Sequence, residues 1–126
     1  MRIFIAGLSL IAAMATCAGP GRSQSQMELT QQSAEEYRAA DRKLNAAYSS
    51  LAAKLSPASK ASLQTAQLAW IRFRDQECEF ETITTVGGSI HSMMVNVCLG
   101  RFTDQRIKDI ERQLNCQEGD LSCVHQ

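Results

Sequence analysis

Residues with the chemistry for catalysis are few in this sequence. His91 stands alone near a glycine pair, and His125 is the penultimate residue. Neither belongs to a Ser-His-Asp set, and no glycine-rich phosphate loop accompanies them. A lone histidine of this kind is usually solvated rather than catalytic. The sequence therefore predicts a protein that is not an enzyme and that requires no cofactor.

The cysteines indicate more about this protein than the histidines do. The C-terminal half of the chain carries four cysteines, which are Cys78, Cys98, Cys116 and Cys123. In a small exported domain, four cysteines predict two disulfides and allow three connectivities. Zinc ligation is the alternative, but the chain has no C-x-x-C pair and no histidine cluster with tetrahedral spacing. The pattern favours disulfides over a metal site.

The spacing of the cysteines favours one connectivity. The Gly87-Gly88 pair lies midway between Cys78 and Cys98, so a helical hairpin that turns there would bring these two sulfur atoms to the same height. Cys116 and Cys123 would then pair by default and close the tail on itself. In the chain-entropy model, a disulfide around a loop of this size contributes about 3 kcal/mol to stability.

Eight polar and aromatic residues recur at helical spacing. They are Asp41, Asn45, Tyr48, Gln67, Trp70, Arg74, Thr103 and Arg106. If their segments form antiparallel hairpins, Asp41 lies opposite Arg74, and Trp70 lies opposite Arg106. We expect a partly buried layer in which Asp41 accepts hydrogen bonds from Arg74 or Arg106. Removing one partner of a buried pair costs about 3–5 kcal/mol.

This layer has two interpretations. An acid beside an arginine and a tyrosine is also typical of a ligand site or a catalytic site. No nucleophile or general base completes a mechanism, however, so we interpret the layer as structural. This interpretation predicts that Asp41→Ala lowers the melting temperature sharply.

Three helices must position these residues, because apolar residues recur at steps of three and four in three segments. The first stripe is Tyr37, Ala40, Leu44, Tyr48, Leu51 and Leu55. The second is Leu63, Ala66, Trp70, Phe73 and Phe80. The third is Ile90, Met94, Val97, Phe102, Ile107, Ile110 and Leu114. No useful segment has the strand period, so we expect an all-α, up-down-up, antiparallel three-helix bundle stapled by disulfides.

The helix boundaries follow from capping residues. Thr30 is suited to cap the first helix, and Ser56-Pro57 has the residues of a break followed by a new helix start. The second helix should end near Thr82, before a β-branched loop. Ser89 is suited to cap the third helix, which we expect Gly100 to kink or loosen at about 1 kcal/mol relative to alanine.

The N-terminal segment has the order of a secretory signal peptide. Arg2 precedes an apolar run over residues 3–15, which is shorter than the roughly 20 residues that span a bilayer. Cleavage is expected between Ala18 and Ser25. A buried N-terminal helix is the alternative, but the Gly19-Pro20-Gly21 break disfavours it. Anchoring as a lipoprotein through Cys17 is also disfavoured, because lipobox sequences usually carry a smaller residue before the cysteine.

Composition limits the number of domains and the classes of partner. A chain of 126 residues suits one domain, and 44% apolar with 21% charged residues is ordinary globular composition. We expect residues 1–25 to be signal peptide and mobile leader, and residues 26–126 to form one helical domain with a disulfide-pinned tail. Thirteen basic and thirteen acidic residues cancel, which argues against a nucleic-acid partner. No second long apolar run predicts a transmembrane helix, and nothing indicates the oligomeric state.

The order of these motifs resembles a known family. The chain carries D-x-x-L-N-x-x-Y at residues 41–48, A-Q-x-x-W-x-x-F-R-D-x-x-C at residues 66–78, G-G-S at residues 87–89, Cys98, and T-x-x-R at residues 103–106. This pattern, across residues 29–115, resembles the LprI-type lysozyme-inhibitor-like family, which includes YecT-like exported proteins.

The resemblance implies a small helical domain in the periplasm or at the cell surface. At least one member of the family is associated with inhibition of host lysozyme. Members often carry a further cysteine early in the first helix, which residues 31–34 lack here. The pairing of Cys116 with Cys123 therefore stays open at this stage.

The resemblance directs attention to the acidic end of the second helix. C-type lysozymes are basic, so an inhibitor should present acidic residues. The candidate partner-binding residues are Asp75, Glu77, Glu79, Glu81, Gly87, Gly88 and Ser89. The alternative interpretation is that these acidic residues are only the solvated end of a helix. The alternative function is that of a non-enzymatic envelope accessory protein that binds another partner.

Overall fold

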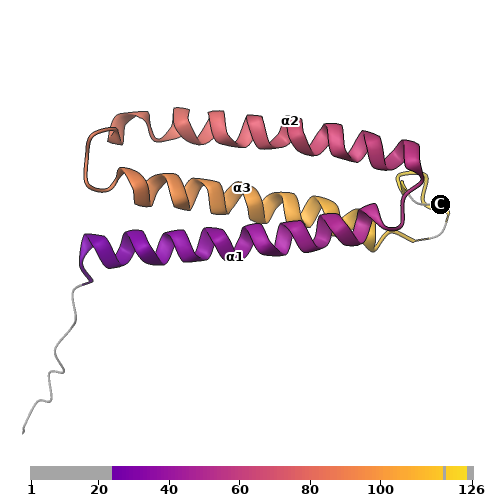
Figure 1. Ribbon diagram of the computed structural model, residues 1–126, viewed down its shortest axis with the longest axis horizontal. Coiled ribbons are helices and arrows are strands. Elements are labelled where there is room, and N and C mark those ends of the chain that lie inside the picture. The colour runs from indigo at the N-terminus through magenta and orange to yellow at the C-terminus, as the bar shows by residue number, and fades with distance from the viewer. Residues whose placement is uncertain (1–23, 118, 125–126) are drawn as a thin grey trace, which may run out of the picture.

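The computed structural model describes residues 24–117 and 119–124 and consists of three long helices joined by short connections. Helix α1 spans Gln26–Ala52, α2 spans Pro57–Glu81 and α3 spans His91–Leu114, with the short 3₁₀ helix η1 at Ile83–Thr85 between α2 and α3. Within these ranges the chain forms no strand. The helices run up, down and up (Figure 1), so the predicted all-α fold is confirmed.

The start of α1 differs from its prediction. The Ser25 hydroxyl accepts a hydrogen bond from the Glu28 amide at 3.2 Å, and the Glu28 carboxylate accepts one from the Ser25 amide at 2.8 Å. This reciprocal capping box satisfies two amides that a bare helix end would leave without partners. Thr30 is therefore not the cap, and its hydroxyl donates to the Gln26 carbonyl inside the helix. Of the predicted signal peptide and mobile leader at residues 1–25, residues 1–23 lie outside the described residues, and Ser25 caps α1.

The start of α2 follows its prediction. The Ser56 hydroxyl accepts a hydrogen bond from the Ser59 amide, and Pro57 occupies the first turn. Proline suits this position because its missing N–H would have no partner within the helix. The helix ends at Glu81, one residue before the predicted end.

The three helices pack unequally. Helix α3 lies closely along α1, whereas α2 approaches α3 less closely and scarcely touches the α1 backbone (Figure 1). The closest pair is therefore the parallel pair of first and third helices. The predicted up-down-up order is confirmed, but the predicted close facing of the first and second helices is wrong.

Side-chain size explains the unequal packing. Ser33 and Ala40 are buried on α1, and a Cβ added at Gly100 of α3 would lie 3.9 Å from the Tyr37 Cα. Small residues allow two helix backbones to approach one another. Large side chains such as Trp70 and Arg74 project from α2 instead, and Trp70 packs against the core. They hold the backbone of α2 at a greater distance.

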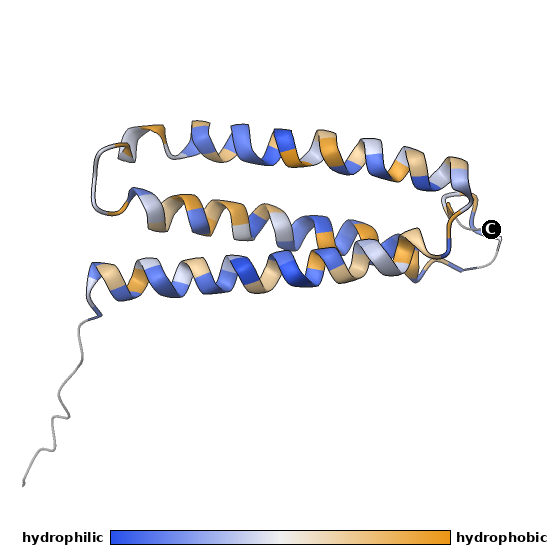
Figure 2. Ribbon diagram, viewed as in Figure 1, coloured by the Kyte–Doolittle hydropathy of each residue, from blue (hydrophilic) through white to orange (hydrophobic). Residues whose placement is uncertain are grey.

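The hydrophobic core is small and comes mainly from α1 and α3. Its buried members are Leu44, Leu51, Ile107 and Ile110, and partly buried residues such as Leu63 and Leu114 pack around them. Several predicted core residues lie outside this cluster. Phe73, Phe80, Ile90, Met94 and Val97 are all exposed. Figure 2 accordingly shows apolar residues interspersed with polar ones along α2 and the first half of α3.

Both predicted disulfides are confirmed. Cys78 pairs with Cys98 across α2 and α3, with their Cα atoms 5.6 Å apart. Cys116 pairs with Cys123 and closes the short tail after α3. In that tail, hydrogen bonds donated by the amide and the hydroxyl of Ser122 lower the pKa of the Asp120 carboxyl.

The connection between α2 and α3 is ordered by its β-branched residues. The Thr82 hydroxyl donates to the Cys78 carbonyl at 2.7 Å, and the Thr85 hydroxyl donates to the Thr82 carbonyl at 2.7 Å. Gly87 then adopts a φ of 80°, which side chains with a Cβ rarely accept. Ser89 does not cap α3, because the helix begins at His91 without a side-chain cap.

Candidate functional site: the disulfide-pinned loop and its hollow

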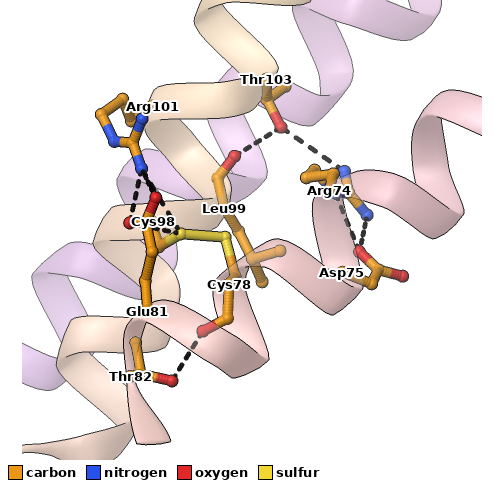
Figure 3. Close-up of a disulfide and its surroundings, with 9 residues drawn as sticks. All are labelled: Arg74, Asp75, Cys78, Glu81, Thr82, Cys98, Leu99, Arg101 and Thr103. Carbon is orange, nitrogen blue, oxygen red and sulfur yellow. Dashed lines mark hydrogen bonds and ion pairs between the residues drawn. A yellow bond between two sulfur atoms is a disulfide. The ribbon is translucent and has the colours of Figure 1, made fainter.

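The Cys78–Cys98 disulfide holds the base of the loop at residues 82–90, which we call the pinned loop. Both cysteines are buried, and Thr82 is also buried beside them. Figure 3 shows the disulfide bridging α2 and α3, with Arg101 and Glu81 beside it and with Arg74, Asp75 and Thr103 further along α2 and α3. The disulfide thus fixes the spacing of the two helix ends from which the loop departs.

Helical geometry divides the acidic run into two faces. Residues four apart lie on the same side of a helix, whereas residues two apart point to different sides. Asp75 and Glu79 therefore share one face, and both line a hollow beside the pinned loop. Glu77 and Glu81 share the other, where the Glu81 carboxylate accepts two hydrogen bonds from Arg101 at 2.7 and 2.6 Å. The structure does not bring the four acids together as one patch.

The hollow is framed by all three helices and the pinned loop, and its volume is about 460 Å³. It is open to solvent at one side. Its apolar lining consists of Ile83, Val86, Val95 and Leu99, together with the Cys78 side of the disulfide. Its polar lining consists of Tyr37, Arg74, Asp75, Glu79, Thr82 and His91. We refer to this site as the loop hollow.

Arg74 is a buried part of the lining of the loop hollow. Its guanidinium carbon lies 5.6 Å from the centre of the Tyr37 ring and 5.1 Å from that of the Trp70 ring. The guanidinium also donates to the Asp75 carboxylate at 2.9 Å and to the Thr103 hydroxyl at 3.4 Å. The cation is 7% exposed, and these contacts hold it in place. The charge of Asp75 is therefore already compensated.

Glu79 differs from Asp75. It is exposed and forms no hydrogen bond or ion pair with the residues the structure describes. Because Arg74 balances Asp75, Glu79 supplies the uncompensated charge at the mouth of the loop hollow. The charged side chains that line the loop hollow therefore sum to −1 when His91 is neutral.

The hydrogen bonds of the pinned loop fix the tautomer of neutral His91. The Thr85 hydroxyl lies 2.9 Å from His91 Nδ1. Its single proton is already donated to the Thr82 carbonyl, so the Thr85 oxygen must accept the second hydrogen bond and His91 Nδ1 must donate it. In the neutral ring, Nε2 is then the acceptor. His91 thus presents an acceptor nitrogen as one of the residues that line the loop hollow.

The predicted polar layer is formed in part. Arg106 Nε donates to the Gln67 amide oxygen at 3.0 Å, and the Arg106 guanidinium lies 5.8 Å from the Trp70 ring centre. The predicted pairing of Asp41 with Arg74 or Arg106 is wrong. Asp41 accepts from Asn45 on its own helix at 3.2 Å, because α2 stands away from α1.

The remaining predicted site residues lie at or near the loop. Gly87 and Gly88 are exposed at its tip. Ser89 lines a separate shallow hollow with residues at the start of α1, such as Met27. Tyr48 packs against the hydrophobic core and has no part in the loop hollow.

Sequence reasoning missed most of the apolar lining of the loop hollow. His91, Val95 and Leu99 recur at every fourth residue, which places them on one face of α3 and is a signal that could have been used. Tyr37 carried no such signal, because its place in the first apolar stripe indicated only burial. Among the described residues, no three His, Cys, Asp or Glu side chains gather in an arrangement that could hold a metal ion.

Two general properties follow from the described part of the chain. None of its helices combines the length and the apolarity that crossing a membrane requires. Its two disulfides are typical of proteins in oxidising compartments, since the cytosol keeps thiols reduced. The disulfides therefore indicate an extracytoplasmic protein.

Comparisons with known proteins identify a relative and a family. Across 141 aligned residues, the chain is 30% identical to an uncharacterized protein of Rhizobium meliloti (strain 1021), and the alignment covers 94% of this chain and 99% of that protein. No solved structure matches the chain. The family model described as "Lysozyme inhibitor LprI" matches residues 17–110, which include all of α1 and α2 and most of α3. The chain therefore belongs to the LprI lysozyme inhibitor family.

Proposed function

We propose that this protein is an exported inhibitor that binds a lysozyme-like muramidase through the pinned loop and blocks it. The single observation that carries the proposal is the exposed apolar end of that loop. Ile83 is 61% exposed and Val86 is 68% exposed, although the Cys78–Cys98 disulfide and Thr82 hold the loop base in the interior. Exposed apolar residues on a fixed support are typical of a protein-binding site.

Pre-organisation supports the choice of this loop. A loop that is already ordered loses little conformational entropy on binding, so more of its contact energy contributes to affinity. The hydrogen bonds of Thr82 and Thr85 and the disulfide supply that order. The tip around Gly87 and Gly88 has few side-chain atoms and is suited to enter a cleft.

Charge supports the choice of a basic partner. C-type lysozymes are basic, and Glu79 presents an uncompensated negative charge next to the exposed Val86. Complementary charge accelerates association and favours the correct partner. We place Glu79 in the interface and leave Glu77 and Glu81 outside it, because Glu81 is engaged by Arg101 on another face.

The proposal includes the location of the protein. The order of residues 1–25 predicts export, and a periplasmic or secreted domain would meet muramidases that attack the cell wall. Mass spectrometry of the protein recovered from the periplasm would test this. We expect an N-terminus between residues 19 and 26 and no lipid on Cys17, whereas an uncleaved or cytoplasmic chain would contradict the export.

The direct test is inhibition of hen egg-white lysozyme on cell-wall substrate by the purified, oxidised protein. We expect dose-dependent inhibition, and we expect Glu79→Lys to weaken it by about tenfold or more because like charges then face each other. Glu111→Lys is the matched control, since Glu111 is an exposed acid near the far end of α3. Absence of inhibition by the wild-type protein would contradict the proposed function and favour a different envelope partner.

A further inference from the structure

We propose that the loop hollow is the seat for one lysine or arginine side chain of the protein partner. The identity of that partner as a lysozyme rests on the proposed function, whereas the preference for a basic side chain rests on the hollow itself.

The apolar lining suits the stem of a long basic side chain. Lysine and arginine carry three or four methylene groups before their charge, and these groups gain free energy against apolar walls. Val86, Val95 and Leu99 supply such walls from the loop and from α3. A volume of about 460 Å³ falls in the range of roughly 300–1,000 Å³ that is usual for small-ligand pockets. The hollow can therefore accept one side chain without rearrangement of the helices.

The charges around the hollow select a cation. Arg74 is the only arginine or lysine in its lining, and Asp75, Thr103 and the two aromatic rings already occupy it. Glu79 remains without a partner among the described residues and provides a carboxylate at the mouth. A basic head group would form a charge-assisted hydrogen bond there, and such bonds are stronger than neutral ones.

In its neutral form, His91 adds a second hydrogen-bond acceptor to the lining of the hollow. Its Nδ1 proton is committed to Thr85, so its Nε2 lone pair is available to an incoming N–H donor. Glu79 comes from α2 and His91 from the start of α3, and the disulfide fixes the spacing of these two elements. An acidic side chain would meet the uncompensated carboxylate of Glu79 and an acceptor nitrogen, so the hollow disfavours it.

The test uses three small probes and the isotope-labelled, oxidised protein. The probes are N-acetyl-lysine-N-methylamide, N-acetyl-arginine-N-methylamide and the uncharged N-acetyl-norleucine-N-methylamide. In a nuclear magnetic resonance titration, we expect both basic probes to shift the signals of Val86, His91, Val95 and Leu99. The norleucine probe should bind at least about fivefold more weakly, because it lacks the charge. The better of the two basic probes identifies the preferred side chain.

Two variants test whether the Glu79 carboxylate binds the basic probes. Glu79→Gln should weaken binding of the basic probes by about five- to tenfold while leaving the norleucine probe unaffected. Glu77→Gln is the matched control, because Glu77 lies two residues away on a different face of α2, and it should change affinity by less than about twofold. Both positions face solvent at least in part, and a thermal melt verifies that each variant folds as the wild type does.

The outcomes separate this inference from the proposed function. Equal affinity for all three probes, or equal effects of the two glutamate variants, would overturn the seat for a basic side chain even if the protein inhibits lysozyme. Selective binding of the basic probes, lost in Glu79→Gln, would support the seat even if lysozyme is not inhibited. In that case the partner would be another basic protein.

Discussion

At the scale of single residues, Arg74 organises the interior between α2 and the other helices. It is buried, and its guanidinium contacts Tyr37 of α1, Trp70 of α2 and Thr103 of α3. Its partner Asp75 is 55% exposed in its side chain, so water screens that ion pair. The contribution of Arg74 to stability therefore comes mainly from its stacking and packing.

Arg74→Ala should consequently destabilise the fold by about 2–4 kcal/mol, because two cation–π contacts and the packed stem are lost. Asp41→Ala should cost only about 0.5 kcal/mol or less, since Asp41 bonds a neighbour on its own helix. This small effect replaces the sharp decrease in melting temperature that the sequence predicted for Asp41→Ala. Urea denaturation measures both, with exposed Arg72→Ala as the control. Equal losses for Asp41→Ala and Arg74→Ala would contradict this account.

At the scale of secondary structure elements, the close pairing of α1 and α3 depends on small residues. Gly100 lies within α3, where the backbones come near each other, and an added Cβ would make an ordinary contact with Tyr37 at 3.9 Å. There is room for a methyl group at this position. A longer side chain would meet the α1 backbone.

Gly100→Ala should therefore stabilise the protein by about 0.5–1 kcal/mol, because alanine has the higher helix propensity. Gly100→Leu should destabilise it by at least about 1 kcal/mol, since the added atoms force the two helices apart. Thermal denaturation of both variants measures this difference. If Gly100→Ala destabilised the fold as much as Gly100→Leu, the position would be a required kink rather than a close approach.

The two disulfides should contribute unequally. The Cys78–Cys98 bridge has a sequence separation of 20 and joins two core helices, whereas Cys116–Cys123 has a separation of 7 and lies in the tail. The double variant Cys78→Ala/Cys98→Ala should lose about 3 kcal/mol, which lowers the melting temperature by roughly 10–20 °C.

The tail double variant, Cys116→Ala/Cys123→Ala, is the matched comparison. It should lower the melting temperature by a smaller amount, because its loop is shorter and none of the described residues after α3 belongs to the core cluster. Differential scanning calorimetry distinguishes the two cases. A larger loss from the tail variant would show that the tail belongs to the cooperative fold.

The sequence predicted the individual helices and their local links better than it predicted which helices pack together. The Ser56-Pro57 start of α2 and the pairing of Cys78 with Cys98 follow from local chemistry and symmetric spacing, and both are confirmed. Periodicity shows which face of a helix is apolar, but it does not show which helix that face meets. For that reason the pairing of α1 with α3, the exposure of Phe73 and the isolation of Asp41 from Arg74 were not predicted.

The candidate site was predictable to a similar extent. The acidic run and the glycine tip drew attention to the end of the molecule that holds the loop hollow, but alternate acids on a helix point to two sides. The apolar lining from Val95 and Leu99 depends on how α3 is rotated relative to α2. That rotation is set by the disulfide and by the packing of α3 on α1, which are tertiary contacts.

At the scale of the whole molecule, the two ends of the bundle differ. Figure 1 shows the turn between α1 and α2 and the tail at one end, and the pinned loop at the other. The Cys116–Cys123 disulfide closes the tail, and the loop hollow lies beside the pinned loop. The core cluster reaches Leu51 and Leu114 and so favours the tail end. The loop end is held instead by one disulfide and by polar contacts, and it carries exposed apolar residues. This division supports the proposal that the loop end of the molecule binds the partner.

The most direct measurement of this account is hydrogen–deuterium exchange of the oxidised protein with and without hen egg-white lysozyme. We predict that lysozyme slows amide exchange in residues 79–95, which contain the end of α2, the pinned loop and the start of α3. Exchange in residues 116–124 of the tail should not change. Unaltered exchange in residues 79–95, or protection confined to the tail end of the bundle, would contradict the account.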